Sequence, residues 1–168
     1  MVFVFFSNLE NARPLSAIIF IIAALTDWLD GWVAREFDQT SKLGAFLDPV
    51  ADKLIVCIAL LIIVQSDPSI INTLVSIVII GREISISALR EWMAELGERH
   101  QVSVIAFSKL KTILQMVGLS CMLYKQPLLG LDIYSIGMIS LIVASILTVW
   151  TMLIYLAKAW PYLQGGMD

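Results

Sequence analysis

Long apolar stretches separated by short polar breaks dominate the chain. After an apolar stub at residues 1–6, they cover residues 15–35, 43–64, 70–89, 102–124 and 133–157. Each stretch has about the 20 residues that a helix needs to cross the hydrocarbon of a bilayer. Strands of a transmembrane barrel would be about half as long and would alternate in polarity. The pattern therefore predicts an all-α fold, a polytopic bundle of transmembrane helices.

Composition and charge agree with a bilayer as the natural solvent. Hydrophobic residues make up 59% of the chain and charged residues only 15%, and the mean hydropathy is +0.87. In soluble domains about a quarter of all residues are usually charged. A length of 168 residues suits one membrane domain, residues 1–168. The net charge of −3 without any basic block argues against nucleic acid as a partner, because phosphates need clustered Lys and Arg.

Basic residues in the polar breaks predict how the chain crosses the membrane. The side with more of them carries Arg35, Lys42, Arg90, Arg99 and Lys158, and the other side carries Arg13 and Lys125. Short cytoplasmic loops are enriched in Lys and Arg. We therefore expect the first side to face the cytoplasm.

Four aspartates interrupt the first two long stretches. Asp27 and Asp30 are three residues apart, and Asp48 and Asp52 are four apart, so each pair lies on one face of its helix. A loop centred near Gln39 joins the two helices. In an antiparallel hairpin Asp30 and Asp48 would lie at similar depth, because each residue adds about 1.5 Å on both helices.

Carboxylates inside a membrane are costly, at least about 2.5–3.5 kcal/mol each at the bilayer centre. Like charges raise one another's pKa values, so four acids at one depth must either take up protons or bind cations. Ligation by oxygen alone favours Mg²⁺, Mn²⁺ or Ca²⁺. The alternative is four solvated aspartates at the membrane interface, which fits two facing pairs poorly.

Small and basic residues follow the first acid pair. Gly31 and Ala34 allow close packing of helices, and they would equally leave room for a ligand. Arg35 is either an anchor on the cytoplasmic side or a ligand for phosphate, to which a guanidinium group is well suited.

Three further cations lie in or near the later apolar stretches, where few acids are present. They are Arg82, Lys109 and Lys111. Glu83 follows Arg82 directly, but consecutive residues do not face each other on a helix, so we expect the two not to pair. Lys109 and Lys111 lie about 200° apart on an ideal helix. These cations either bind an anion or reach water along the helix surface.

The residues from Asp27 to Asp52 match the pattern D-x2-D-G-x2-A-R-x8-G-x3-D-x3-D at all eight fixed positions. This is the signature of the CDP-alcohol phosphotransferase family, which the chain resembles. Residues 26–53, 81–97 and 108–112 are most similar to the bacterial phosphatidylglycerophosphate synthases. The resemblance implies a six-helix fold, of which the first helix is largely missing here.

The resemblance also implies roles for the aspartates. Asp27, Asp30 and Asp48 would hold two divalent metal ions, Mg²⁺ or Mn²⁺. Asp52 would complete the metal site and act as the general base.

Further site residues follow from the same resemblance. The CDP site would be lined by Gly31, Ala34 and Arg35. The basic residues that would meet the phosphate of the acceptor are Arg82, Lys109 and Lys111.

The implied reaction transfers a phosphatidyl group from CDP-diacylglycerol to sn-glycerol 3-phosphate and releases CMP. The enzyme would be a homodimer in the bacterial cytoplasmic membrane, in contact with membrane lipid, with its active site on the cytoplasmic side. One alternative is the same chemistry with serine, inositol phosphate or a second lipid as the acceptor. Another is a divalent-cation transporter, which would need a path open to both sides of the membrane.

Overall fold

The computed structural model describes residues 1–36, 42–95 and 106–165, and their regular structure is helical. The helices are α1 (Val2–Phe5), α2 (Ala12–Glu36), α3 (Lys42–Ser66), α4 (Ile70–Glu95), α5 (Ala106–Tyr124) and α6 (Ile133–Gly165). The predicted all-α fold is confirmed. Each of the five apolar stretches forms one long helix, and the stub at residues 1–6 forms the four-residue helix α1.

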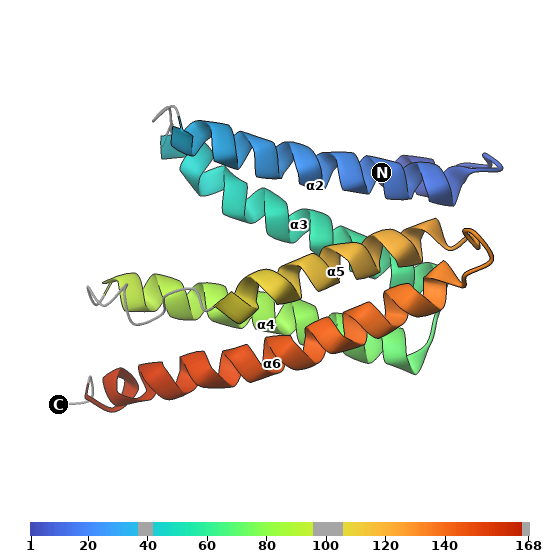
Figure 1. Ribbon diagram of the computed structural model, residues 1–168. Helices are drawn as coiled ribbons and strands as arrows, with labels where there is room; N and C mark the ends of the chain where they lie inside the picture. Colours follow the sequence, from blue (N-terminus) through green and yellow to red (C-terminus); the bar gives the residue numbers. More distant parts are fainter. Residues whose placement is uncertain (37–41, 96–105, 166–168) are drawn as a thin grey trace.

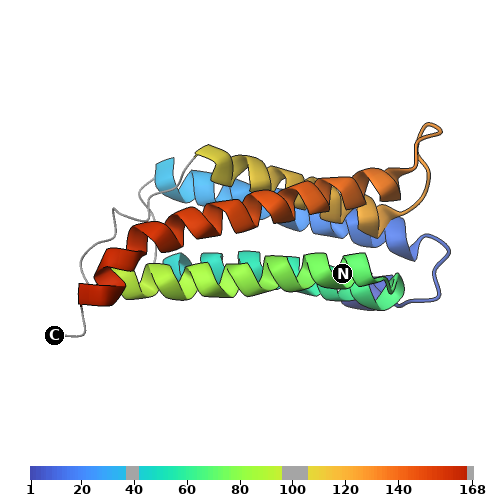
Figure 2. The same ribbon diagram turned by 90° about the horizontal axis from the view of Figure 1, so that it is seen from below.

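The long helices run up and down in chain order (Figures 1 and 2). Helices α2, α4 and α6 run in one direction, and α3 and α5 run in the other. Helix α5 is central and packs against α2, α3 and α6, while α4 packs against α3 and α6. We call the end at which α2 finishes at Glu36 and α3 begins at Lys42 the motif end. The opposite end, where α3 finishes at Ser66 and α4 begins at Ile70, is the loop end.

The outer surface of the bundle is apolar. Among the described residues, Ile70–Ala94 and Ile133–Ala157 form helices long and apolar enough to cross a membrane. Large side chains such as Leu61, Ile77 and Trp150 are exposed. Contiguous apolar surface of this kind is rare on soluble monomers and suits contact with lipid.

Helices α5 and α6 approach each other closely through two glycines. A Cβ atom on Gly118 would lie 2.9 Å from the carbonyl oxygen of Gly137, and one on Gly137 would lie 2.8 Å from the carbonyl oxygen of Gly118. Real Cβ atoms essentially never come closer than 3.0 Å to another heavy atom. Two backbones therefore touch here because neither residue has a side chain, as is common between membrane helices.

Replacing Gly137 by alanine should destabilise the bundle by about 1–3 kcal/mol, because the new methyl group meets backbone that cannot move aside cheaply. Thermal unfolding of the purified protein in detergent measures this effect. Gly81→Ala on α4 is the matched control, since nothing lies within 4 Å of the position of its Cβ. Alanine is favoured over glycine in a helix by about 1 kcal/mol, so the control should unfold no earlier than the parent protein. Equal unfolding temperatures for Gly137→Ala and the parent protein would contradict the close approach.

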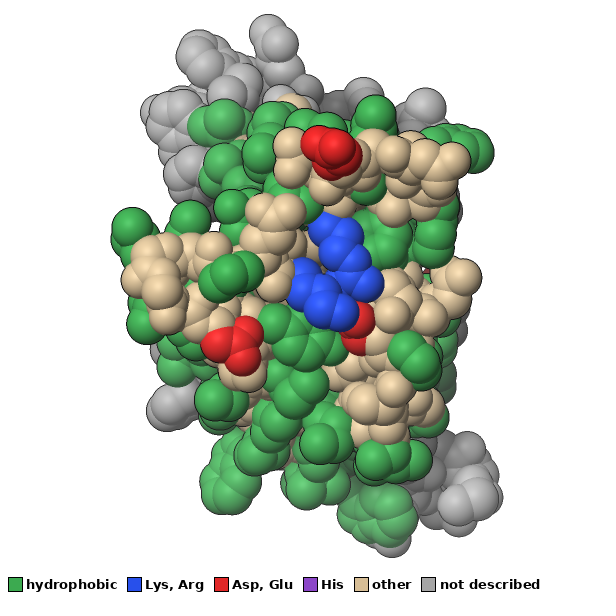
Figure 3. Space-filling view, turned by 90° about the vertical axis from the view of Figure 1, so that its right-hand side faces the viewer, with side chains coloured by type: hydrophobic (Ala, Val, Ile, Leu, Met, Phe, Trp, Pro, Cys, Tyr) green, Lys and Arg blue, Asp and Glu red, His purple; other side chains and the backbone are tan. Residues whose placement is uncertain are grey.

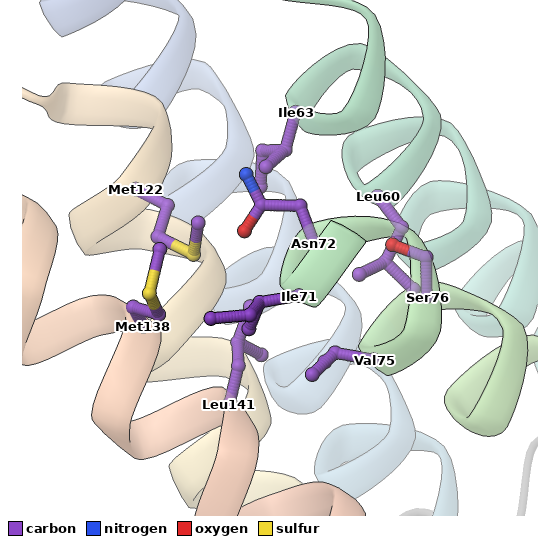
Figure 4. A pocket seen from close by; sticks show the side chains of 9 residues that line it. All are labelled: Leu60, Ile63, Ile71, Asn72, Val75, Ser76, Met122, Met138 and Leu141. Carbon is purple, nitrogen blue, oxygen red and sulfur yellow. The ribbon is translucent and has the colours of Figure 1, made fainter. Parts of the chain in front are cut away.

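A small cavity lies between α3, α4, α5 and α6. Its volume is about 10 Å³, and side chains from all four helices point toward one another around it, among them Leu60, Ser76, Met122 and Leu141 (Figure 4). Such a volume holds about one water molecule. The cavity is therefore too small for a substrate.

Candidate functional site

The predicted acidic motif lies on two neighbouring antiparallel helices at the motif end. Asp27 and Asp30 belong to α2, and Asp48 and Asp52 belong to α3. The two helices contact each other. Along the backbone, Asp30 and Asp48 are equally far from the helix ends that the connection joins, so their Cα atoms lie at similar depth.

Most side chains of the motif lie outside the described part of the structure. They are those of Asp27, Asp30, Gly31, Ala34, Arg35 and Asp48, and the side chain of Lys109 on α5 lies outside it too. The side chain of Asp52 is described and is exposed. Among the described side chains, no group of three His, Cys, Asp or Glu could hold a metal ion. Convergence of the four aspartates on metal ions therefore stays a prediction.

Lys53, next to Asp52, ties α3 to α4. Its ammonium group donates a hydrogen bond to the hydroxyl of Ser87, and the lysine is half-buried. Sequence reasoning missed this contact, because nothing in the spacing of residues 53 and 87 indicates that their side chains lie within reach of each other. The bond ties α4 to α3 through the residue that follows the last aspartate of the motif.

Arg82 on α4 points into the bundle, and only 5% of its surface is exposed. Its Nη1 donates to the carboxylate of Glu83. The prediction that these two residues do not pair is therefore wrong. Both side chains are long and flexible, so their ends meet beside the helix although their Cβ atoms point in different directions. The Nε of Arg82 is buried without a hydrogen-bond partner, so the ion pair satisfies only part of the guanidinium group.

Lys111 on α5 is buried as well, with 5% of its surface exposed. This burial does not fit a lysine whose ammonium group reaches water along the helix surface. Arg82 and Lys111 thus place two cations inside a bundle whose other described interior side chains are mostly apolar or uncharged. Buried cations are stable only beside anions and hydrogen-bond acceptors, so this interior suits an anionic group.

The loop end holds a second group of charges, far from the motif end. The carboxylate of Asp67 accepts hydrogen bonds from Arg13, at 2.8 and 3.3 Å, and from Lys125. Figure 3 looks onto this end and shows the basic side chains together at its centre. The prediction that Arg13 and Lys125 share one side of the bundle is confirmed. The three residues join α2, the α3–α4 connection and the α5–α6 connection.

Asp67 should make folding sensitive to acid. Burial alone raises the pKa of Asp67, but the hydrogen bonds and charges of Arg13 and Lys125 outweigh it and hold the pKa below its ordinary value. A carboxyl group with a lowered pKa stabilises the fold above its unfolded pKa of about 3.9, and that contribution is lost as the pH falls through the folded pKa.

Asp67→Asn should therefore lower stability near pH 7 by up to about 1 kcal/mol, since the pairs are partly exposed. The difference from the parent protein should disappear once the pH falls below the lowered pKa of Asp67, where the carboxyl group itself becomes protonated. Chemical unfolding in detergent at several pH values measures both effects. Glu10→Gln, an exposed acid at the same end, is the control and should leave the curve unchanged. A constant difference at all pH values would contradict the ionic role.

Comparison with known proteins supports a membrane enzyme of lipid synthesis. Residues 1–152 match the model of the CDP-alcohol phosphatidyltransferase family. A relative from Wigglesworthia glossinidia brevipalpis is 50% identical over 159 residues, which are 95% of this chain and 86% of that protein. Relatives from Haemophilus influenzae and Salmonella choleraesuis are both 46% identical, over 94% and 95% of this chain and 84% and 86% of theirs. All three are named CDP-diacylglycerol–glycerol-3-phosphate 3-phosphatidyltransferase.

The matched region holds every feature of the candidate site. It contains the acidic motif on α2 and α3, the buried Arg82 on α4 and the buried Lys111 on α5. The apolar exterior of the bundle and the lipid chemistry of the family agree that this is a membrane protein. The chain belongs to the CDP-alcohol phosphatidyltransferase family.

Proposed function

We propose that the protein transfers the phosphatidyl group of CDP-diacylglycerol to sn-glycerol 3-phosphate, giving phosphatidylglycerophosphate and CMP in phospholipid biosynthesis. The observation that carries this proposal is the identity of 46–50%, over nearly the whole chain, with relatives named for that reaction. The eight fixed positions of the family signature are all present between Asp27 and Asp52.

Members of this family generally use divalent metal ions. We assign two ions, Mg²⁺ or Mn²⁺, to Asp27, Asp30, Asp48 and Asp52. The donor set fits, because it consists of carboxylates alone, which suit hard cations. When bound, the ions supply neutralising charge for the pyrophosphate and for the departing CMP.

The protein's own residues have separate tasks in this proposal. Asp52 takes the proton from the hydroxyl group of the acceptor, as a general base. The nucleotide lies against Gly31 and Ala34, whose small size lets it approach α2, and Arg35 contacts its phosphates.

The acceptor phosphate binds among Arg82, Lys109 and Lys111. Two of these cations are buried, and an anionic group offsets the cost of that burial. Lys53, the neighbour of Asp52 on α3, donates a hydrogen bond to Ser87 on α4, the helix that carries Arg82. This contact supports placing the reacting hydroxyl near Asp52 while the phosphate binds at Arg82.

The test is an assay of the purified protein with labelled CDP-diacylglycerol and a set of acceptors. We expect rapid release of CMP with sn-glycerol 3-phosphate and little with serine, because serine has no phosphate to pair with the buried cations. Efficient transfer to serine would refute the acceptor but not the family.

We also propose that the motif end faces the cytoplasm, in the bacterial inner membrane. The excess of Lys and Arg in the connections at that end supports this orientation. A cysteine introduced at position 67 should then react with a membrane-impermeant thiol reagent added to intact cells. A cysteine at position 40 should not react, and the reverse result would invert the orientation.

The protein is further proposed to act as a homodimer, as the family resemblance implies. Apolar side chains exposed on α3 and α4, such as Leu61 and Ile77, offer a surface that a second copy would cover as well as lipid does. Light scattering of the protein in detergent measures its mass. A monomer at all protein concentrations would exclude a stable dimer.

A further inference from the structure

Thr148 on α6 differs from the hydroxyl residues beside it. Its surface is 1% exposed, and its Oγ1 is buried without a hydrogen-bond partner. Ser145 donates to the carbonyl oxygen of Ile142 at 2.7 Å, and Thr151 donates to that of Thr148 at 3.0 Å. Such bonds to the preceding turn are the usual way for a hydroxyl group to be satisfied in a helix. The hydroxyl of Thr148 is therefore left for another partner.

The register between α4 and α6 shows what lies level with Thr148. The two helices run in the same direction and pack against each other. Near the loop end Asn72 of α4 and Met138 of α6 line the same cavity, and near the motif end the guanidinium group of Arg90 on α4 lies 5.7 Å from the ring centroid of Tyr155 on α6. The sequence separations of the two pairs differ by one residue. Parallel helices that keep nearly one separation at both ends also keep it between them, since each residue adds the same rise.

Arg82 and Thr148 have this separation to within one residue, so they lie at nearly the same level on neighbouring helices. Both side chains are at least nine-tenths buried. The Nε of Arg82 and the Oγ1 of Thr148 are the two buried side-chain polar atoms without a hydrogen-bond partner in the described part of the protein. Two unsatisfied polar atoms at one depth of an apolar bundle indicate a shared ligand, because each costs about 1–3 kcal/mol when left unpaired.

Lys111 joins this level from α5. Helices α5 and α6 are antiparallel, and a Cβ atom on Gly118 would lie 2.8 Å from Cγ of Leu141. Lys111 is two turns before Gly118, and Thr148 is two turns after Leu141. Since the helices run in opposite directions, both steps lead toward the motif end by the same distance. Arg82, Lys111 and Thr148 therefore form one polar layer, with a side chain from each of three helices.

We propose that Thr148 binds the acceptor substrate, with its hydroxyl and the Nε–H of Arg82 both donating to oxygens of a phosphomonoester group. This inference rests on the proposed function and adds a residue of α6 to the acceptor site. Lys111 supplies the second positive charge of the layer. The acyl chains of a lipid substrate have no acceptor atoms, so they would leave both donors unpaired, whereas a phosphate offers several oxygens to them.

The experiment compares three variants in the intact protein. Thr148→Val removes the hydroxyl and keeps the shape, Thr148→Ser keeps the hydroxyl, and Thr151→Val removes a neighbouring buried hydroxyl that already has a backbone partner. KM for sn-glycerol 3-phosphate, KM for CDP-diacylglycerol and the inhibition constant of inorganic phosphate are measured for each. A hydrogen bond to a charged group is worth enough that Thr148→Val should raise the first and third values about tenfold. KM for CDP-diacylglycerol should change less than about twofold, since the layer does not contact that substrate.

Thr148→Ser and Thr151→Val should both resemble the parent protein in all three constants. The inference is overturned if Thr148→Val leaves the constant for inorganic phosphate unchanged, or raises both KM values equally. If Thr148→Val instead damaged the fold, all three constants would change together. Thr151→Val, which also removes a buried hydroxyl group, would then show the same change. If the parent protein does not use sn-glycerol 3-phosphate at all, the proposed function has failed, whereas an unaffected Thr148→Val in an active parent refutes only the role of Thr148.

Discussion

Asp48→Asn should lower the turnover of CMP release by several orders of magnitude while the protein stays folded. Asparagine keeps the size of aspartate but removes the negative charge, which a divalent ion needs in this all-carboxylate donor set. Asp132→Asn is the matched control, because it makes the same chemical change at an exposed position of the loop end. The control should keep nearly full turnover. Binding of Mn²⁺, followed by its paramagnetic resonance, should weaken in Asp48→Asn and not in Asp132→Asn. Near-normal turnover of Asp48→Asn would refute the metal site.

The Asp52→Asn variant tests whether Asp52 acts as a general base or only as a metal ligand. A general base acts in the chemical step and contributes about 10²–10⁴-fold to the rate. The loss in this variant should therefore fall mainly on kcat, with the affinity for CMP and CDP-diacylglycerol less affected. If nucleotide binding collapses and the remaining complexes turn over normally, Asp52 is only a metal ligand.

The helices were predictable from the sequence because a bilayer leaves the backbone little choice. Every peptide group in hydrocarbon must bond within its own segment, so an apolar stretch of about 20 residues forms a helix almost regardless of its detail. The depth of Asp30 and Asp48 on the backbone follows from the same regular rise. Neither prediction required knowledge of side-chain packing.

Contacts that depend on side-chain reach or on register could not be read from the sequence. The ion pair of Arg82 and Glu83 contradicts the spacing rule, because flexible ends meet where the Cβ atoms do not. Nothing in the sequence indicates that Gly118 and Gly137 face each other, because the contact depends on how α5 packs against α6. In the sequence Thr148 looks like any other threonine of a membrane helix. Only the structure shows that the hydroxyl groups of Ser145 and Thr151 donate to backbone carbonyl oxygens while that of Thr148 has no partner.

Removing the charge of Arg82 should affect the acceptor far more than the lipid substrate. Arg82→Ala should raise KM for sn-glycerol 3-phosphate about 10- to 100-fold, since a hydrogen bond to a charged group contributes about 1.5–3 kcal/mol. KM for CDP-diacylglycerol should change less than about threefold. Glu83 complicates this simple variant, because its carboxylate loses the partner that Arg82 provides. An unpaired carboxylate inside the bundle would disturb both substrates without any role for Arg82 in binding.

The double variant Arg82→Ala with Glu83→Gln removes this ambiguity. If Arg82 only neutralises Glu83, the double variant leaves no unpaired charge and should recover a normal KM for sn-glycerol 3-phosphate. If Arg82 binds the phosphate, the double variant should stay defective, while Glu83→Gln alone should bind sn-glycerol 3-phosphate at least as tightly as the parent protein, since it frees Nη1 of Arg82. Steady-state kinetics with both substrates varied distinguish the two cases. Equal shifts of both KM values in the double variant, or serine reacting as well as sn-glycerol 3-phosphate, would refute the acceptor site and leave the family assignment intact.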